Sequence, residues 1–309
     1  MPRTPYFRPL LILLALLLAA CSGPAPAGDQ APDRLNVVAT TTLVGDVVRV
    51  IGGEAIALDV LLPVGAEPHG YQPSPQDLAE LSQADLVFVN GLGLEEALMP
   101  TLASAVAHEK IVAVSDSVEA IELAGGEDEG EHEHGLDPHA WTDPNNVMVW
   151  TDNIVRALSA ANPAQRDGYE SRATAYRQQL TALDAWIRQQ VAQIPERKRK
   201  LVTDHAVFGY FARRYGLEQV GAVIPGFSAL AEPSAQELAA LEDAIRGLGV
   251  GAIFVGNTVN PSLAERVAKD ANTRLLFIYS DSLSDADGPA ATYLDFMRYN
   301  VGVFVDGLR

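Results

Sequence analysis

The sequence contains a single cysteine, Cys21, in 309 residues, so it can form no internal disulfide and offers no pair of thiolates to a metal. Basic residues are also few. Lys and Arg total 22 against 40 Asp and Glu, which gives a formal net charge of −18. Such an acidic chain is poorly suited to a phosphate backbone, which argues against nucleic-acid binding. Histidine is limited to six residues, so each of them stands out as a candidate for chemistry.

One apolar run, Leu10–Ala20, follows Arg3 and Arg8 near the N-terminus. The run is too short to span a bilayer comfortably, and its basic start and small residues at the end predict a secretory signal over residues 1–21. The sequence Leu18-Ala19-Ala20-Cys21 resembles a bacterial lipoprotein signal, which implies lipid attachment at Cys21. An ordinary signal peptide, with no role for Cys21, is the alternative. Residues 22–34 are rich in Pro, Gly and Ala and predict a flexible tether.

Apolar, β-branched segments alternate with amphipathic helical patterns along the rest of the chain. The expected strands are Leu35–Ala39, Ala55–Leu62, Asp85–Asn90 and Lys110–Val114 in the first half, and Lys200–Thr203, Gln219–Ile224, Val250–Val255 and Arg274–Tyr279 in the second. Strands alternating with helices indicate an α/β protein with parallel sheets, and the length allows two cores. We therefore expect two lobes, residues 35–161 and 196–309, each with a four-stranded parallel sheet flanked by helices.

The longest helical pattern lies between these two halves. It begins at Asn162-Pro163 and ends before Pro195, and apolar residues from Tyr169 to Val191 recur every three or four positions. A helix of about 31 residues spans about 46 Å, which is longer than one small domain needs. Residues 162–195 are therefore expected to form a backbone helix that joins the lobes. The alternative is an ordinary long helix within one domain.

Three histidines stand alone where a predicted strand gives way to the next element: His69, His139 and His205. Asp281 follows the last predicted strand. Because the carboxyl ends of strands in α/β proteins face a common crevice, these side chains are expected to meet there. Three imidazoles and one carboxylate would complete the tetrahedral shell that Zn²⁺ prefers. The sequence therefore predicts a metal site between the lobes, whereas His108, beside Glu109 and Lys110, is expected to be exposed and without a role.

Several motifs, in their order along the chain, resemble those of the solute-binding lipoproteins of bacterial zinc and manganese ABC importers. They are Pro68-His69, Asp137-Pro138-His139-Ala140-Trp141, His205-Ala206-Val207-Phe208-Gly209, Glu232-Pro233-Ser234 and Tyr279-Ser280-Asp281-Ser282. The resemblance implies two lobes joined by one long helix, with the metal held by His69, His139, His205 and Asp281. Glu232 lies in a matching loop and is the alternative carboxylate ligand. One departure is Gly256-Asn257, where the family often has an acidic residue, so local packing at the cleft is expected to differ from the family's.

The resemblance also implies partners and a location. An ABC permease and its ATPase would receive the metal, and a lipid at Cys21 would anchor the chain, as a monomer, outside the cytoplasm on a bacterial membrane. The nitrogen-rich ligand set favours zinc, since imidazole suits zinc and manganese-preferring relatives typically carry a carboxylate at the position of His205. Manganese is the alternative metal. Residues 126–135, acidic with His132 and His134, form either a weak zinc collector or an incidental solvated loop.

The competing function class is a zinc hydrolase. Catalytic zinc keeps an open coordination position for water, which four protein ligands would fill. The sequence also has no H-E-x-x-H run, nucleophile elbow or phosphate-binding glycine loop. Nothing in it encodes the adhesive surface of a surface adhesin, a third class. We therefore expect a non-enzymatic capture protein whose metal affinity falls as pH drops through about 6.5, because ligating histidines must be neutral.

Overall fold

Residues 1, 34–122, 135–226 and 228–309 are described in the computed structural model. The predicted signal with Cys21, nearly all of the tether, and His132 and His134 lie outside the described residues. Leu35–Arg309 form one compact unit. In its described part, two four-stranded parallel sheets have the strand orders β2-β1-β3-β4 and β6-β5-β7-β8, so the predicted α/β architecture is confirmed.

The first sheet is built around β1, whose last three residues are fully buried. Its lobe contains β1 (Leu35–Ala39), α2 (Thr42–Gly52), β2 (Ile56–Val60), α3 (Pro75–Gln83), β3 (Leu86–Val89), α4 (Met99–Ala105), β4 (Ile111–Ala113) and α5 (Pro144–Ala161). Val38 pairs with Asp59 on one side and Val87 on the other. Ser74 caps α3 in a capping box with Asp77, as the sequence indicates. The loops after β1, β2 and β3 therefore leave the sheet at one edge.

The second sheet repeats this strand order with β5 in the place of β1, and all four residues of its neighbour β7 are buried. Its lobe contains β5 (Lys200–Thr203), α7 (Gly209–Tyr215), β6 (Glu218–Ala222), α8 (Ala235–Leu248), β7 (Ala252–Val255), α9 (Ser262–Asp270), β8 (Arg274–Phe277) and α10 (Tyr293–Leu308). Ser234 and Glu237 form the capping box of α8. Most strands are shorter than predicted, because apolar residues beyond them, such as Leu61, Leu62 and Ile278, are buried in loops.

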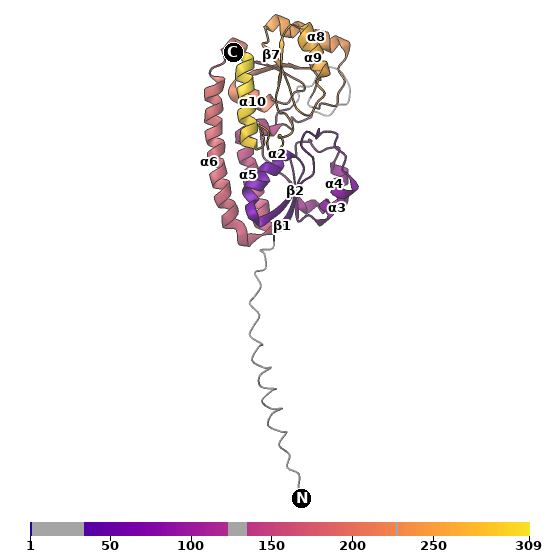
Figure 1. The fold of residues 1–309 in the computed structure, drawn as a ribbon, viewed down its shortest axis with the longest axis vertical. Helices are drawn as coiled ribbons and strands as arrows, with labels where there is room; N and C mark the ends of the chain where they lie inside the picture. The colour runs from indigo at the N-terminus through magenta and orange to yellow at the C-terminus, as the bar shows by residue number, and fades with distance from the viewer. Residues whose placement is uncertain (2–33, 123–134, 227) are drawn as a thin grey trace. The chain divides into compact units, whose positions relative to one another are not determined.

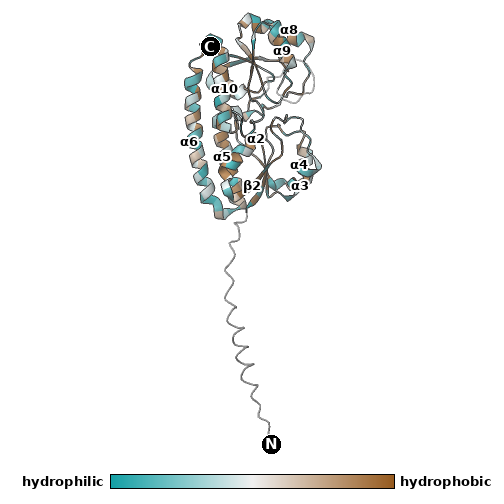
Figure 2. Cartoon of the chain, in the orientation of Figure 1, coloured by the Kyte–Doolittle hydropathy of each residue, from teal (hydrophilic) through white to brown (hydrophobic). Residues whose placement is uncertain are grey.

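One long helix, α6 (Arg166–Val191), lies alongside elements of both lobes. It follows a 3₁₀ turn over Pro163–Gln165 and packs against α2, α5 and α10 (Figure 1). Its buried residues are those of the predicted stripe: Tyr169, Ala173, Tyr176, Leu180, Leu183, Ile187 and Val191. Figure 2 shows that the outer surface of α6 is largely hydrophilic whereas α5 and α10 are more apolar. The helix therefore packs mainly on α2, α5 and α10.

The largest buried apolar cluster is continuous across both lobes. It runs from Val37 and Leu43 through Trp150 and Leu183 to Phe254 and Phe304. Two smaller clusters lie under α3 and α4 in one lobe and under α8 and α9 in the other. Shared packing of this kind resists wide bending between the lobes, because packed interiors are dense and poorly deformable.

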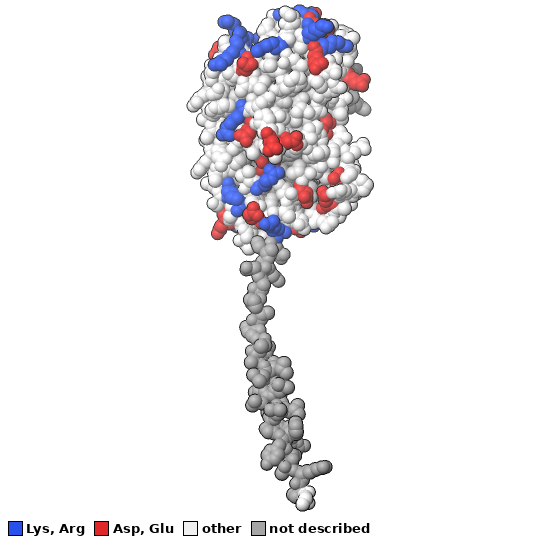
Figure 3. Space-filling view, in the orientation of Figure 1, with Lys and Arg blue, Asp and Glu red and all other residues white. Residues whose placement is uncertain are grey.

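The surface is charged but mixed in sign. On the face seen in Figure 3, lysine and arginine side chains are interspersed with acidic ones. Some form ion pairs, such as Arg246 with Glu242 and Asp243. Within the described residues, no helix combines the length and apolar character that crossing a bilayer requires.

Candidate metal centre

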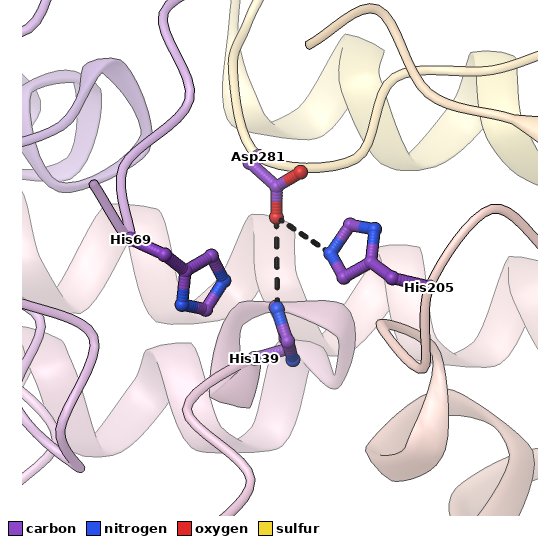
Figure 4. A group of neighbouring side chains, drawn as sticks. All are labelled: His69, His139, His205 and Asp281. Carbon is purple, nitrogen blue, oxygen red and sulfur yellow. Dashed lines mark ion pairs between the residues drawn. The ribbon is translucent and has the colours of Figure 1, made fainter. Parts of the chain in front are cut away.

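The four side chains singled out by the sequence converge at one point between the lobes. His69 comes from the loop after β2, His139 immediately precedes a 3₁₀ turn before α5, His205 follows β5, and Asp281 follows β8. Each offers one atom to a group in which all such atoms lie within 4.8 Å of one another. Figure 4 shows the three imidazole rings and the carboxylate facing a common centre. Two of the four residues come from each half of the chain.

The spacing of these atoms is close to that of a tetrahedral shell. Asp281 Oδ1 lies 3.5 Å from His205 Nε2 and 3.7 Å from His139 Nε2. Bonds of about 2.0–2.1 Å to a Zn²⁺ ion would place tetrahedral ligand atoms about 3.4 Å apart. His69 is slightly more distant, with ring centroids 5.5 Å from His139 and 6.1 Å from His205. A small shift of the His69 loop would therefore close the shell.

Aspartates orient the two fully buried histidines. Asp137 Oδ1 accepts the backbone N–H of His139 at 2.9 Å and lies 2.8 Å from its Nδ1. Asp204 Oδ1 does the same for His205, at 2.7 and 3.0 Å. A carboxylate on Nδ1 fixes the ring orientation and leaves Nε2 facing the centre, the arrangement common around metal-bound histidines.

Hydroxyl groups hold Asp281 through only one of its two carboxylate oxygens. Its Oδ2 accepts hydrogen bonds from Ser280 Oγ at 2.6 Å and Thr258 Oγ1 at 2.9 Å. Its Oδ1 is buried and has no hydrogen-bond partner within the described structure, and the same holds for Nε2 of His69 and of His205. Buried polar atoms without hydrogen-bond partners are costly, so these three atoms are suited to hold a bound ion.

His69 is the least enclosed of the four. Its side chain retains 10% of its accessible surface, whereas the other three are fully buried. Glu67 holds the His69 turn by accepting the backbone N–H groups of His69 and Gly70 at 3.1 and 3.0 Å. The route from solvent to the centre therefore passes the His69 loop.

The charges of the site are strongly coupled. Burial raises the pKa of Asp281, but His205 and then the other two imidazoles outweigh it and hold that pKa well below its ordinary value. Burial lowers the pKa of His205, but Asp281 and Asp204 outweigh burial and hold it well above its ordinary value. Burial, with His139, lowers the pKa of His69 to about 3. Without metal, the centre therefore contains an imidazolium–carboxylate pair and one neutral imidazole.

The lobes meet around this centre through hydrogen bonds as well as apolar packing. Trp141 Nε1 donates to the carbonyl of Ser280 at 2.9 Å, and the backbone N–H of Gly65 donates to Ser282 Oγ at 2.8 Å. Tyr293, the first residue of α10, reaches the other lobe twice. Its hydroxyl donates to the carbonyl of Trp141 at 2.7 Å and its backbone N–H donates to Asp46 Oδ2 at 2.9 Å.

Other residues considered from sequence lie elsewhere. Glu232 is exposed and outside the cluster, and His108 is exposed in a short 3₁₀ turn. Sequence patterns alone assign no role to Asp137 or Asp204, although a carboxylate one or two residues before a histidine is a usable signal. Thr258 carried no such signal, because it is far from Asp281 in the sequence.

Comparisons with known proteins show the family to which the chain belongs. The family model described as zinc-uptake complex component A, periplasmic, matches residues 37–307. The chain is 34% identical to the manganese-binding lipoprotein MntA of Halalkalibacterium halodurans and 33% identical to the manganese ABC transporter substrate-binding lipoprotein PsaA of Streptococcus pneumoniae, over 97% of each chain in both cases.

Solved structures include a similar fold. The periplasmic zinc binding protein TroA from Treponema pallidum superposes with a TM-score of 0.80 at 28% identity, over 89% of this chain and 99% of that one. A family match over nearly all of the described chain is decisive for function class, and this family provides the substrate-binding components of ABC transporters rather than enzymes. The chain thus belongs to the zinc-uptake complex component A family and is an extracytoplasmic substrate-binding protein of a metal ABC transporter.

Proposed function

We propose that the protein captures Zn²⁺ at the centre formed by His69, His139, His205 and Asp281 and delivers it to a membrane permease driven by an ATPase. The observation that carries the proposal is the convergence of three imidazoles and one carboxylate within 4.8 Å, with three donor atoms buried and lacking hydrogen-bond partners in the described structure. Three nitrogens, one oxygen and near-tetrahedral spacing suit zinc.

Manganese is the second candidate, because the relatives MntA and PsaA are named for manganese. Manganese is a harder ion that favours oxygen donors and higher coordination numbers. The four-residue cluster supplies one carboxylate, and Glu67 Oε1 lies 4.0 Å from His69 Nε2. Zinc therefore fits the donor set better.

A competition titration separates the two metals. The purified protein, stripped of metal, is titrated with Zn²⁺ and with Mn²⁺ against a chromophoric chelator, and the bound metal is then measured after incubation with equimolar amounts of both ions. We expect one Zn²⁺ per chain and Zn²⁺ retained in excess over Mn²⁺. Retention of manganese would reject the zinc assignment, and no tight binding of either ion would reject the capture site.

The remaining parts of the proposal concern the chain around the site. We assign residues 1–21 to a lipoprotein signal, Cys21 to the lipid and residues 22–34 to the tether, with lobes over 35–161 and 196–309 joined by 162–195. Cys21→Ser should release the protein from the membrane fraction of expressing bacteria.

Deletion of residues 127–134 tests zinc collection, since unchanged uptake at scarce zinc would leave that segment without a role. Light scattering of the soluble variant is expected to give the mass of a monomer.

A further inference from the structure

Gly256 lies directly after β7 in a position where no side chain fits. A Cβ atom there would lie 2.0 Å from Ser280 Oγ, 2.8 Å from Ser280 Cβ and 2.9 Å from Asp204 Oδ2. These separations are shorter than real contacts allow, so one of the neighbours would have to move. Gly256 does not have a positive φ, so its backbone is open to any residue. The requirement for glycine is therefore one of space rather than of backbone conformation.

The first neighbour, Asp204, controls His205. The backbone N–H of Gly256 donates to Asp204 Oδ2 at 2.6 Å. The other oxygen of Asp204 accepts the backbone N–H of His205 and faces its Nδ1. Asp204 is 2% exposed, so it has little freedom to move away from a new atom. A displacement of Asp204 would therefore be transmitted to the imidazole of His205.

The second neighbour, Ser280, controls Asp281. Ser280 Oγ donates to Asp281 Oδ2 at 2.6 Å, and Ser280 is fully buried. Its carbonyl also accepts from Trp141 Nε1, which ties the segment to the opposite lobe. Ser280 is therefore confined on several sides, and pressure on it would shift the carboxylate of Asp281.

We infer that Gly256 is a positioning residue that sets the 3.5 Å separation between His205 Nε2 and Asp281 Oδ1, and through it the preference of the centre for a small tetrahedral ion. The inference rests on the proposed zinc capture. Gly256 touches neither ligand; it acts because the supports of both ligands pack against its bare Cα. A side chain at this position forces the two donor atoms apart, and a wider opening suits a larger ion with more ligands.

The test is Gly256→Ala, with Gly247→Ala as the matched control. Gly247 lies in α8 of the same lobe, is exposed and has open space where a Cβ would be. Changing a residue that supports a metal ligand typically weakens metal binding by about 10–100-fold, and we expect a loss of zinc affinity in that range for Gly256→Ala. Manganese affinity should change much less, so the ratio of zinc to manganese affinity falls. Gly247→Ala should match the wild type for both ions.

Cobalt gives a readout that a loss of stability alone does not affect. Tetrahedral Co²⁺ absorbs visible light far more strongly than five- or six-coordinate Co²⁺, so the band of the cobalt-loaded protein should weaken in Gly256→Ala and persist in Gly247→Ala. The double variant Gly256→Ala with Ser280→Gly removes both Ser280 atoms that the new Cβ would meet. It should recover affinity and band intensity toward those of Ser280→Gly alone.

Each outcome bears on a different claim. If wild-type protein binds zinc tightly and Gly256→Ala has the same metal preference and cobalt band, Gly256 does not set the spacing and the inference is overturned. If the wild type binds no metal, the capture proposal itself fails. Should Gly256→Ala not fold, the comparison passes to the double variant. There, a zinc-to-manganese ratio and a cobalt band in the double variant that match those of Ser280→Gly support the inference, and a ratio that stays well below that of Ser280→Gly rejects it.

Discussion

At the scale of single residues, the centre is organised by what holds each ligand rather than by the ligands alone. Asp137 and Asp204 each use one oxygen to fix both the backbone and the ring of a histidine. Asp281 is fixed from its outer oxygen by two hydroxyl groups. The donor atoms are thus aimed at the centre before a metal arrives, which lowers the cost of ordering them on binding.

The identity of the carboxylate ligand can be tested directly. Asp281→Ala removes an atom of the centre and the carboxylate that faces His205 Nε2 at 3.5 Å, so zinc affinity should fall by more than the roughly 10–100-fold typical of outer-shell changes. Glu232→Ala, which alters an exposed carboxylate outside the cluster, is the control and should bind like the wild type. Isothermal titration against a competing chelator measures both. Equal losses in the two variants would contradict the assignment.

Proton release should accompany metal binding at neutral pH. The raised pKa of His205 means that its imidazole is protonated in the metal-free protein, and the metal must displace that proton. The affinity should therefore weaken by about tenfold for each pH unit below the pKa of His205 and level off above it. Because Asp281 and Asp204 raise this pKa, the dependence begins above 6.5, at higher pH than an unperturbed histidine would give.

Calorimetry in two buffers of different ionisation enthalpy counts the released protons, and about one per Zn²⁺ is expected at pH 7. A count near zero would mean that His205 is already neutral. The raised pKa of His205 also affects the stability of the metal-free protein. A raised folded pKa stabilises the protein fully below the unfolded value of 6.5, and that contribution is lost as pH rises through the folded pKa.

At the scale of elements, much of the fold could be predicted from the sequence because the patterns that indicate helices and strands are local. The capping boxes at Ser74 and Ser234, the stripe on α6 and the centres of all eight strands depend on neighbouring residues only. Strand ends were less predictable, since Leu61 and Leu62 are buried by tertiary packing without belonging to a strand. The roles of Thr258 and Gly256 could not be predicted, because they depend on how β7 and β8 bring distant residues together.

The stripe on α6 should carry much of the stability of the described unit. Leu183 is 1% exposed in the cluster shared by both lobes, so Leu183→Ala should lower the free energy of unfolding by about 2–5 kcal/mol. Gln189→Ala on the exposed face of the same helix should change it by less than about 0.5 kcal/mol. Urea unfolding followed by circular dichroism measures both. A loss confined to one of two separate transitions would show that the lobes unfold independently.

At the scale of the whole molecule, the proposed site takes two residues from each half, which would couple metal binding to the association of the lobes. Metal that binds only the folded form should stabilise it by about 2.7 kcal/mol when its free concentration is 100 times Kd. Thermal unfolding should therefore move to a higher temperature with added Zn²⁺. The shift should disappear in His205→Ala, which keeps the lobes but removes one donor.

Lobe movement on metal loss should be small. The continuous apolar cluster and the contacts of α6 with α2, α5 and α10 leave little room for hinge bending. X-ray scattering with and without Zn²⁺ should give nearly superimposable profiles, with any change confined to loops such as that of His69. A large decrease in the radius of gyration on binding would contradict this.

Tyr293 also affects the order in which the chain can be completed during biosynthesis. Asp46 is buried, and one of its oxygens is satisfied by the backbone N–H of a residue 247 positions further along. A buried carboxylate without its partner is costly. A nascent chain that has not yet reached α10 therefore lacks one hydrogen-bond partner of Asp46, so the first lobe gains its full set of contacts only after the last helix has been made.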